Sequence, residues 1–192
     1  MSISEDGLRK NQANFASLSP LSFLERTRKT FPNQTAIEYK DYKLSYKQAG
    51  QRCDALANLI KNQNFNSGTT IAVMLPNIPV MWECHFGVPM ATGVLNAINT
   101  RLDSHTVQFI LEHGEAKLFI YDSEYSPIVE KALVNLKNPP TVIEFVDEVA
   151  GNKRSNFANK VNCLDYETEL KNFTGTTFEH VLPNDEWNSI AV

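Results

Sequence analysis

The amino-acid sequence predicts an α/β fold: a doubly wound, mostly parallel sheet with flanking helices, preceded by a small β-hairpin. Short runs that are apolar on both faces recur along the chain, as buried parallel strands require. Longer stretches with apolar residues at helical spacing separate these runs. Because strands and helices alternate, we expect βαβ units and parallel strands.

The chain is expected to begin with a helix and a hairpin. Ser19 followed by Pro20 is typical of an N-cap and a first helical residue, and this helix should end near Thr30. In residues 36–46, apolar and polar side chains alternate on both sides of a turn near Asp41. That alternation predicts two antiparallel strands joined by a tight turn.

The second predicted helix begins with a capping box. Ser45 and Gln48 have the S-x-x-Q spacing in which each side chain caps the other's backbone N–H. The helix behind them carries small and apolar residues at helical spacing on one face: Ala49, Cys53, Leu56, Ala57 and Ile60. The stretch 62–68 ends it, and residues 71–75 then predict the first buried strand.

A helix and a second strand should follow this first buried strand. Asn77 can cap the helix, with Pro79 in its first turn. Pro89 lies inside the helical pattern, so we expect a kink or a break there. Residues 94–95 suggest a second buried strand.

Two more helices and two more strands are expected before residue 147. Asp103 or Ser104 should cap the next helix, and Gly114 should end it. Residues 118–121 and 141–146 predict the remaining strands, with a helix between them. The inward faces of these helices carry Val107, Ile110, Leu111, Ile128, Val129, Ala132 and Leu133.

The two ends of the chain differ from its middle. Residues 1–18 are polar and predict a flexible N-terminus, so that residues 19–192 form the folded part. Residues 147–186 are polar and predict irregular structure. Residues 187–192 are apolar and suggest a nascent buried strand, which favours a sequence interrupted within a domain.

Composition excludes several classes of protein. A net charge of -4 is mild and argues against nucleic acid as a partner. The 3 cysteines, Cys53, Cys84 and Cys163, are far apart, which fits neither a disulfide framework nor a zinc site. No apolar run is long enough to cross a bilayer, and the first residues lack the apolar core of a secretory signal. We therefore expect a cytoplasmic protein.

Familiar catalytic motifs are missing from the sequence. It contains no dinucleotide fingerprint, Walker A loop, nucleophile elbow or H-E-x-x-H motif. Residues 67–70 and 174–177, S-G-T-T and T-G-T-T, could offer backbone N–H groups to a phosphate. Neither has the lysine that a phosphate loop usually supplies, so we interpret both as simple turns.

Two side chains are candidates for a site. His85, beside aromatic residues, could line a pocket, although a hydrogen-bonded core histidine is the favoured interpretation. Asp122 follows a strand, where ligands bind in open α/β sheets, but capping the next helix is the plainer role. His105 and His113 are interpreted as surface or capping residues. From the residues alone we assign no catalytic, cofactor-binding or metal-binding residue.

Several segments, taken in order, resemble the AMP-forming synthetase superfamily of acyl-CoA synthetases, luciferases and nonribosomal adenylation domains. They are L-S-Y at 44–46, I-A-V-M-L-P-N at 71–77, A-T-G-V-L-N-A-I-N-T-R-L at 91–102, L-E-H-G-E-A-K at 111–117 and D-E-W-N-S-I-A at 185–191. Asp122 matches the aspartate after the family's next strand, and Gly114 departs from a serine in the family pattern. The H-F-G-V-P-M version at 85–90 is most similar to the branch that activates short- or medium-chain carboxylates.

The resemblance implies an acyl-CoA synthetase that activates a fatty or other small carboxylic acid with ATP and transfers it to coenzyme A. The full-length protein would use ATP, Mg²⁺ and coenzyme A. The family's phosphate loop and later lysine and acidic motifs do not occur in residues 1–192. The chain is therefore expected to be the incomplete N-terminal part of the large adenylate-forming domain, inactive alone and without a tightly bound cofactor.

Two other interpretations remain open. One is a non-catalytic truncated paralogue that acts as a binding or pairing module, which the missing chemistry motivates. The other is an unrelated nucleotide-binding α/β domain, since fold alone does not determine function. Acyl chain length and oligomeric state are left open by the sequence.

Overall fold

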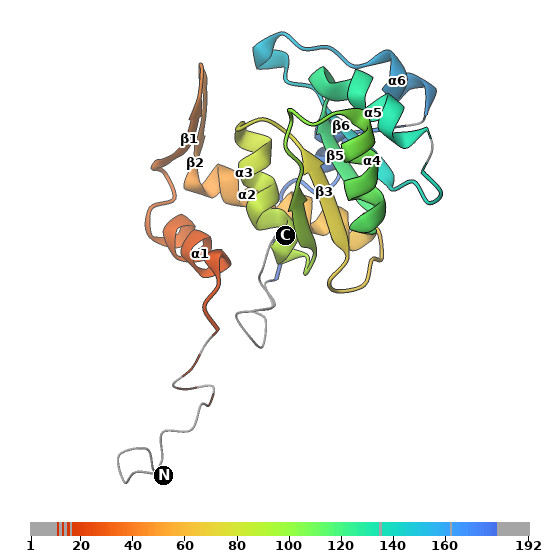
Figure 1. Ribbon diagram of the computed structural model, residues 1–192. Coiled ribbons are helices and arrows are strands. Elements are labelled where there is room, and N and C mark those ends of the chain that lie inside the picture. The colour runs from red at the N-terminus through yellow and green to blue at the C-terminus, as the bar shows by residue number, and fades with distance from the viewer. Residues whose placement is uncertain are drawn as a thin grey trace.

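The computed structural model describes residues 11, 13, 15, 17–134, 136–161 and 163–179. Five parallel strands form one sheet in the order β4-β3-β5-β6-β7, with helices on both faces, and an antiparallel hairpin stands beside it (Figure 1). The strands are β1 Thr35–Tyr39, β2 Tyr42–Ser45, β3 Thr70–Met74, β4 Val94–Ala97, β5 Leu118–Asp122, β6 Thr141–Phe145 and β7 Leu164–Asp165. The predicted fold class is confirmed.

The helices alternate with the strands of this sheet. They are α1 Pro20–Thr30, α2 Tyr46–Asn62, α3 Pro79–Met90, α4 Ser104–His113, α5 Ser126–Leu133, α6 Asn156–Lys160 and α7 Tyr166–Lys171, with short 3₁₀ turns η2 Ser123–Tyr125 and η3 Glu148–Ala150. After β4 the chain crosses to the other side of β3, where β5 pairs in parallel with it. In doubly wound sheets, ligands bind near such a reversal, at the carboxyl ends of the strands.

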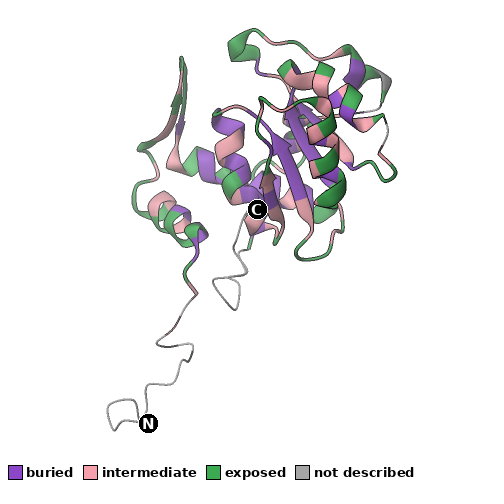
Figure 2. Ribbon diagram, in the orientation of Figure 1, coloured by how far each residue is buried: buried purple, intermediate pink, exposed green. Residues whose placement is uncertain are grey.

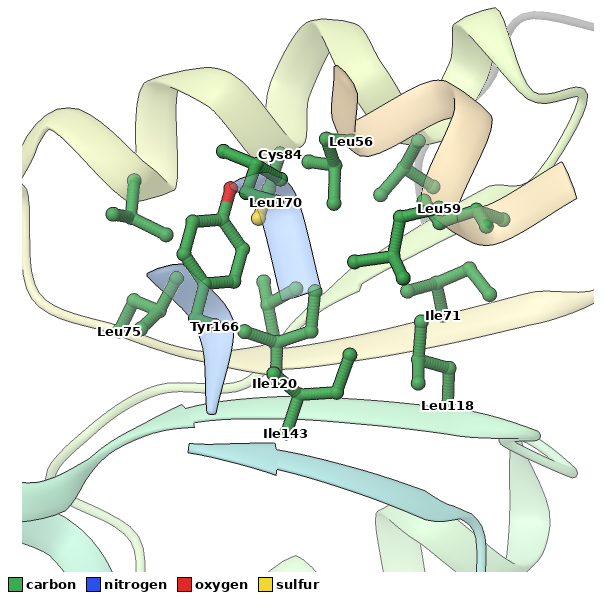
Figure 3. Close-up of a cluster of buried hydrophobic side chains, with 14 of the residues drawn as sticks. Leu56, Leu59, Ile71, Leu75, Cys84, Leu118, Ile120, Ile143, Tyr166 and Leu170 are labelled. Atoms are coloured by element: carbon green, nitrogen blue, oxygen red, sulfur yellow. The ribbon is translucent and has the colours of Figure 1, made fainter. Parts of the chain in front are cut away.

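Two apolar clusters hold the helices on the sheet. On one face, residues such as Ile71 and Ile120 pack against α2, α3 and α7 (Figure 3). On the other face, alternate residues such as Met74 and Phe119 pack against α4, α5 and α6. Because both faces are covered, every residue of β5 is buried, and Figure 2 shows burial concentrated in the sheet and the inner sides of the helices.

The predicted helix starts agree well with the structure. Ser19 caps α1 through its side chain, and the reciprocal capping box of Ser45 and Gln48 is present at α2. Of the two candidates at α4, Asp103 is the cap, because its carboxylate accepts from the backbone N–H groups of His105 and Thr106. Local capping chemistry therefore sets these boundaries.

The predicted cap of α3 is wrong. Ile78, not Asn77, is the N-cap, and it makes no side-chain cap hydrogen bond. Pro79 at the first helical position explains the shift, since a proline holds the residue before it in an extended conformation, and Ile78 has φ -120° and ψ 169°. The expected break at Pro89 is found one residue later, where α3 ends at Met90.

Gly114 ends α4, but not by adopting the left-handed conformation that is common for a glycine at the end of a helix. Its φ is -78°, and the left-handed residue is Glu115, with φ 49°. A Cβ on Gly114 would lie 3.0 Å from the carbonyl oxygen of Ile110 and 3.1 Å from Nδ2 of Asn96. Glycine is thus needed here for close packing of the helix end on β4.

The segment predicted to be irregular after residue 147 is largely structured where it is described. It contains η3, α6, β7 and α7, and β7 adds a fifth strand through the pairs Ile143–Leu164 and Glu144–Asp165. These elements are only two to six residues long, too short to produce a clear periodic pattern. The nascent strand expected at residues 187–192 lies outside the described residues.

Candidate functional site

A cavity of about 490 Å³ opens at the carboxyl ends of β6 and β7. The hairpin β1–β2 and the turn η3 form its outer walls, and α2, α3 and α7 form its floor. It lies at the carboxyl edge of the sheet, the edge where open α/β sheets bind ligands, but at β6 and β7 and not at the reversal of strand order beside β3. We therefore take this cavity, with the strand-end carboxylates beside it, as the candidate functional site.

The floor of the cavity is an ion-pair network that joins three helices. Arg52 of α2 donates from Nε to Glu83 of α3 over 2.5 Å and from a terminal nitrogen to Glu167 of α7 over 2.5 Å. The hydroxyl of Tyr166 donates to Glu83 over 2.8 Å, and Figure 3 shows its ring within the apolar cluster beneath α3. Glu83 is fully buried, so its charge depends on these donors.

The protonation of this network follows from burial and from its partners. Burial alone would lower the pKa of Arg52, but the charges and hydrogen bonds of Glu83 and Glu167 outweigh it and raise that pKa. Burial raises the pKa of the Glu83 carboxyl, while Arg52 and Tyr166 oppose that rise. The guanidinium therefore stays charged and is already engaged by two carboxylates.

Two hydrogen bonds tie the hairpin to the loop after β6, and we call them the hairpin latch. The Tyr39 hydroxyl donates to Oδ2 of Asp147 over 2.6 Å, and Lys40 Nζ donates to the carbonyl oxygen of Val149 over 3.1 Å. Hydrogen bonding to Asp147, followed by burial, raises the pKa of Tyr39 to about 12. The latch closes one side of the cavity.

Replacing Tyr39 with phenylalanine should lower the free energy of unfolding by about 1 kcal/mol near pH 8, because a hydrogen bond to a charged group is lost at a partly exposed site. Folding raises the Tyr39 pKa from 10.0 to about 12, so the neutral phenol stabilises the fold below pH 10. That contribution is lost as the pH rises through 12. Urea unfolding of both proteins across this range measures it, and equal stabilities near pH 8 would contradict a stabilising latch.

Asp122 is the last residue of β5 and is fully buried. Its Oδ1 accepts from the backbone N–H of Glu124, capping η2, and from Nδ2 of Asn152 over 3.1 Å. Within the part of the chain that the structure describes, Oδ2 has no hydrogen-bond partner. Burial is the main cause that raises the pKa of Asp122, with the charge of Asp147 adding to it. The capping interpretation is confirmed, and the residue also stands at the carboxyl edge of the sheet, opposite Phe145 in register.

His85 does not belong to the core. It is exposed on α3, where its Nδ1 lies 2.8 Å from the carbonyl oxygen of Met81. On α3, Cys84 faces the core between the helix and the sheet, so His85, the next residue, faces the hairpin. His85 lines a groove of about 420 Å³ between β1 and the start of α3. The interpretation as a core histidine is wrong, and the pocket-lining alternative is confirmed.

The other candidate features have plain roles. Gly68 and Gly175 have φ of 82° and 83° and lie in turns, which agrees with the interpretation of both fragments as turns. His105 and His113 are exposed, as expected. Within the described part of the chain, no group of three or more histidine, cysteine, aspartate or glutamate residues could hold a metal ion. No helix among the residues described is both long and apolar enough to span a bilayer.

Sequence reasoning missed five residues that line the cavity, Tyr39, Arg52, Glu83, Asp147 and Glu167, and Tyr166, which supports Glu83 from beneath. One signal was available. Glu83 is a charged residue in the otherwise apolar run around Val80 and Val88, which suggests a buried carboxylate with a partner elsewhere. The identity of that partner, Arg52, is decided only by the packing of α2 on α3.

Comparison with known proteins gives a consistent set of relatives. A model of the AMP-binding enzyme family matches residues 24–185. The chain is 34% identical, over 97% of its length, to an acetate–CoA ligase of Humulus lupulus. It is 33% identical, again over 97% of its length, to a peroxisomal acetate/butyrate–CoA ligase of Arabidopsis thaliana. The chain spans about a third, 34%, of the length of each.

A shorter match and a solved structure agree with these relatives. Over 67% of its length, the chain is 43% identical to a peroxisomal trans-cinnamate:CoA ligase of Petunia hybrida, of which it covers 22%. The crystal structure of an anthranilate CoA ligase in complex with anthranoyl-AMP superimposes with a TM-score of 0.73 and 18% identity. That superposition covers 90% of this chain and 31% of the ligase, and it supports the fold alone.

Proposed function

Because the chain belongs to the AMP-binding enzyme family, we propose that it is the N-terminal portion of a carboxylate–CoA ligase that activates a small carboxylic acid with ATP. The main support for this proposal is that the chain is 34% identical, over 97% of its length, to an acetate–CoA ligase. The ordered motifs described above support the same proposal. We further propose that residues 19–192 form the N-terminal part of the family's large domain and that the protein is cytoplasmic. The N-terminus predicted to be flexible, residues 1–18, lies mostly outside the described residues.

The proposed reaction has two steps. A carboxylate oxygen attacks the α-phosphate of ATP, giving an acyl-adenylate and pyrophosphate, and the thiol of coenzyme A then takes the acyl group and releases AMP. Stabilising the charge that develops on phosphate oxygens requires several donors or a metal ion. ATP, Mg²⁺ and coenzyme A are therefore proposed as requirements of the full-length protein.

The candidate site does not fit ATP. The cavity beside β6 and β7 is lined by more carboxylates than cations, and its Arg52 is held by Glu83 and Glu167. An acidic wall opposes a polyphosphate instead of holding it. We therefore derive no step of the reaction from these residues and propose that this part of the protein is the scaffold, inactive alone and without a tightly bound cofactor.

The experiment compares the natural full-length protein with residues 1–192. Each is incubated with ATP, Mg²⁺, coenzyme A and either acetate, butyrate or trans-cinnamate, the acids named for the relatives. Pyrophosphate release and acyl-CoA formation are measured, with reactions lacking the acid as controls. We expect both products from the full-length protein with at least one acid, and neither from residues 1–192.

Two outcomes would contradict the proposal. A full-length protein that releases no pyrophosphate with a broad panel of carboxylates would favour the non-catalytic module. Acyl-adenylate formation by residues 1–192 alone would show that the phosphate-handling groups lie within this chain. A fluorescent fusion of the full-length protein, viewed with a peroxisomal marker, tests the cytoplasmic location, since two of the relatives are named as peroxisomal.

A further inference from the structure

The cavity at the carboxyl ends of β6 and β7 has a strongly acidic and aromatic lining. Five carboxylates face it against two cations: Glu83, Asp147, Glu148, Asp165 and Glu167 against Arg52 and Lys171. Three aromatic rings, those of Tyr39, Tyr42 and Phe145, add π surfaces to its walls. Carboxylates and aromatic faces together are the surroundings that an organic cation prefers.

The positive charge of Arg52 is not available to a ligand. Its Nε and one terminal nitrogen donate to Glu83 over 2.5 and 3.2 Å, and both terminal nitrogens donate to Glu167 over 2.5 and 3.1 Å. Two carboxylates thus hold one guanidinium, and the group carries a net negative charge. A phosphate or carboxylate ligand would have to displace Glu83, which is fully buried and would then lose its partner.

Asp147 keeps capacity for a further donor. It is 4% exposed, lines the cavity, and accepts one hydrogen bond on each oxygen, from the Tyr39 hydroxyl and from the Ala150 N–H. A carboxylate has about four acceptor positions, so roughly two remain unused. One strand away, and outside the lining of the cavity, Oδ2 of the fully buried Asp122 has no hydrogen-bond partner among the described residues. Negative charge at this sheet edge is therefore only partly compensated by the described residues.

We propose that this cavity binds a small organic cation, a primary ammonium carried on an aromatic or short alkyl body. The ammonium would lie against Asp147, and the body would pack between Tyr42 and Phe145. A volume of about 490 Å³ is within the range of small-molecule sites. The site goes beyond the proposed function, because ATP, coenzyme A and the carboxylate substrate are all anions.

The test is a calorimetric titration of the full-length protein with three probes of similar shape. They are 2-phenylethylamine, which is a cation at neutral pH, the neutral 2-phenylethanol and the anion 3-phenylpropionate. We expect the amine to bind at least about tenfold more tightly than the alcohol, as one charge-assisted contact predicts, and the anion not to bind in the cavity. Equal binding of amine and alcohol, or binding of an oligolysine peptide but not the amine, would overturn the proposal.

Variants locate the binding. Asp147→Asn should weaken the binding of the amine by about tenfold and leave the binding of the alcohol unchanged. The matched control is Glu112→Gln. It removes one negative charge from an exposed position of α4, on the opposite face of the sheet, and should leave the binding of both probes unchanged. Tyr39→Phe frees an oxygen of Asp147, so amine binding should be retained or strengthened. If Asp147→Asn and Glu112→Gln weakened the binding of the amine equally, only the overall charge of the protein would matter, and the proposed site would be wrong.

Discussion

Replacing Glu83 with leucine should lower the free energy of unfolding by about 4 kcal/mol, because it leaves Nε of Arg52 and the buried hydroxyl of Tyr166 without their acceptor. Glu83 accepts from Arg52 and Tyr166, and both of these donors lie in or beneath the floor of the cavity. The leucine fills much of the volume but satisfies neither. Urea denaturation followed by tryptophan fluorescence measures the loss.

Two variants calibrate this result. Glu83→Gln keeps an acceptor oxygen and should cost clearly less than Glu83→Leu. Glu167→Gln removes the negative charge of the outer partner of Arg52 but keeps an acceptor oxygen. The Glu167 side chain is 41% exposed, so solvent screening should hold the cost below about 1 kcal/mol. If Glu83→Leu and Glu167→Gln were equally costly, the buried pair would not hold α2 and α3 together.

Replacing Phe119 with alanine should also cost about 4 kcal/mol, for an apolar reason. Phe119 is the second residue of β5, fully buried in the cluster between the sheet and α4, with its ring centroid 5.8 Å from that of Tyr121. Truncation removes the ring and leaves a cavity that the surrounding strands cannot fill. The stability loss is read from urea unfolding.

The same chemical change on the surface provides the control. Phe109 lies on α4 and is 58% exposed, with its ring stacked on His113. Phe109→Ala should change the free energy of unfolding by less than about 1 kcal/mol, because little apolar surface returns to water. A similar loss for both phenylalanines would mean that the two-sided burial of β5 does not govern stability.

Most of the fold could be predicted from the sequence, because its signals are local. The apolar run at β3, the capping box of Ser45 and Gln48, and the aspartate cap of α4 each depend on residues within a few positions. The errors had two causes: a neighbour that overrides a local preference, and an element too short to show a pattern. Pro79 moved the cap from Asn77 to Ile78, and β7 was too short for its pattern to be recognised.

The candidate site was hardly predictable. Asp122 was correctly assigned as a cap, whereas His85 was placed in the core although it lies on the outer side of α3. The residues that form the cavity carry no motif, since a tyrosine, an arginine and several carboxylates occur in any surface segment. Only Glu83, a charge within an apolar helix, carried a detectable signal.

By itself, the sequence determined the alternation of strands and helices, their caps and the ordered motifs of an AMP-binding enzyme, because periodicity and capping act within one or two turns of chain. The tertiary structure alone decided which distant side chains meet. Tyr39 reaches Asp147 across 108 positions, and Arg52 reaches Glu167 across 115. Such contacts arise from the strand order and from the packing of helices on the sheet, and a charge is buried only where that packing brings it a partner.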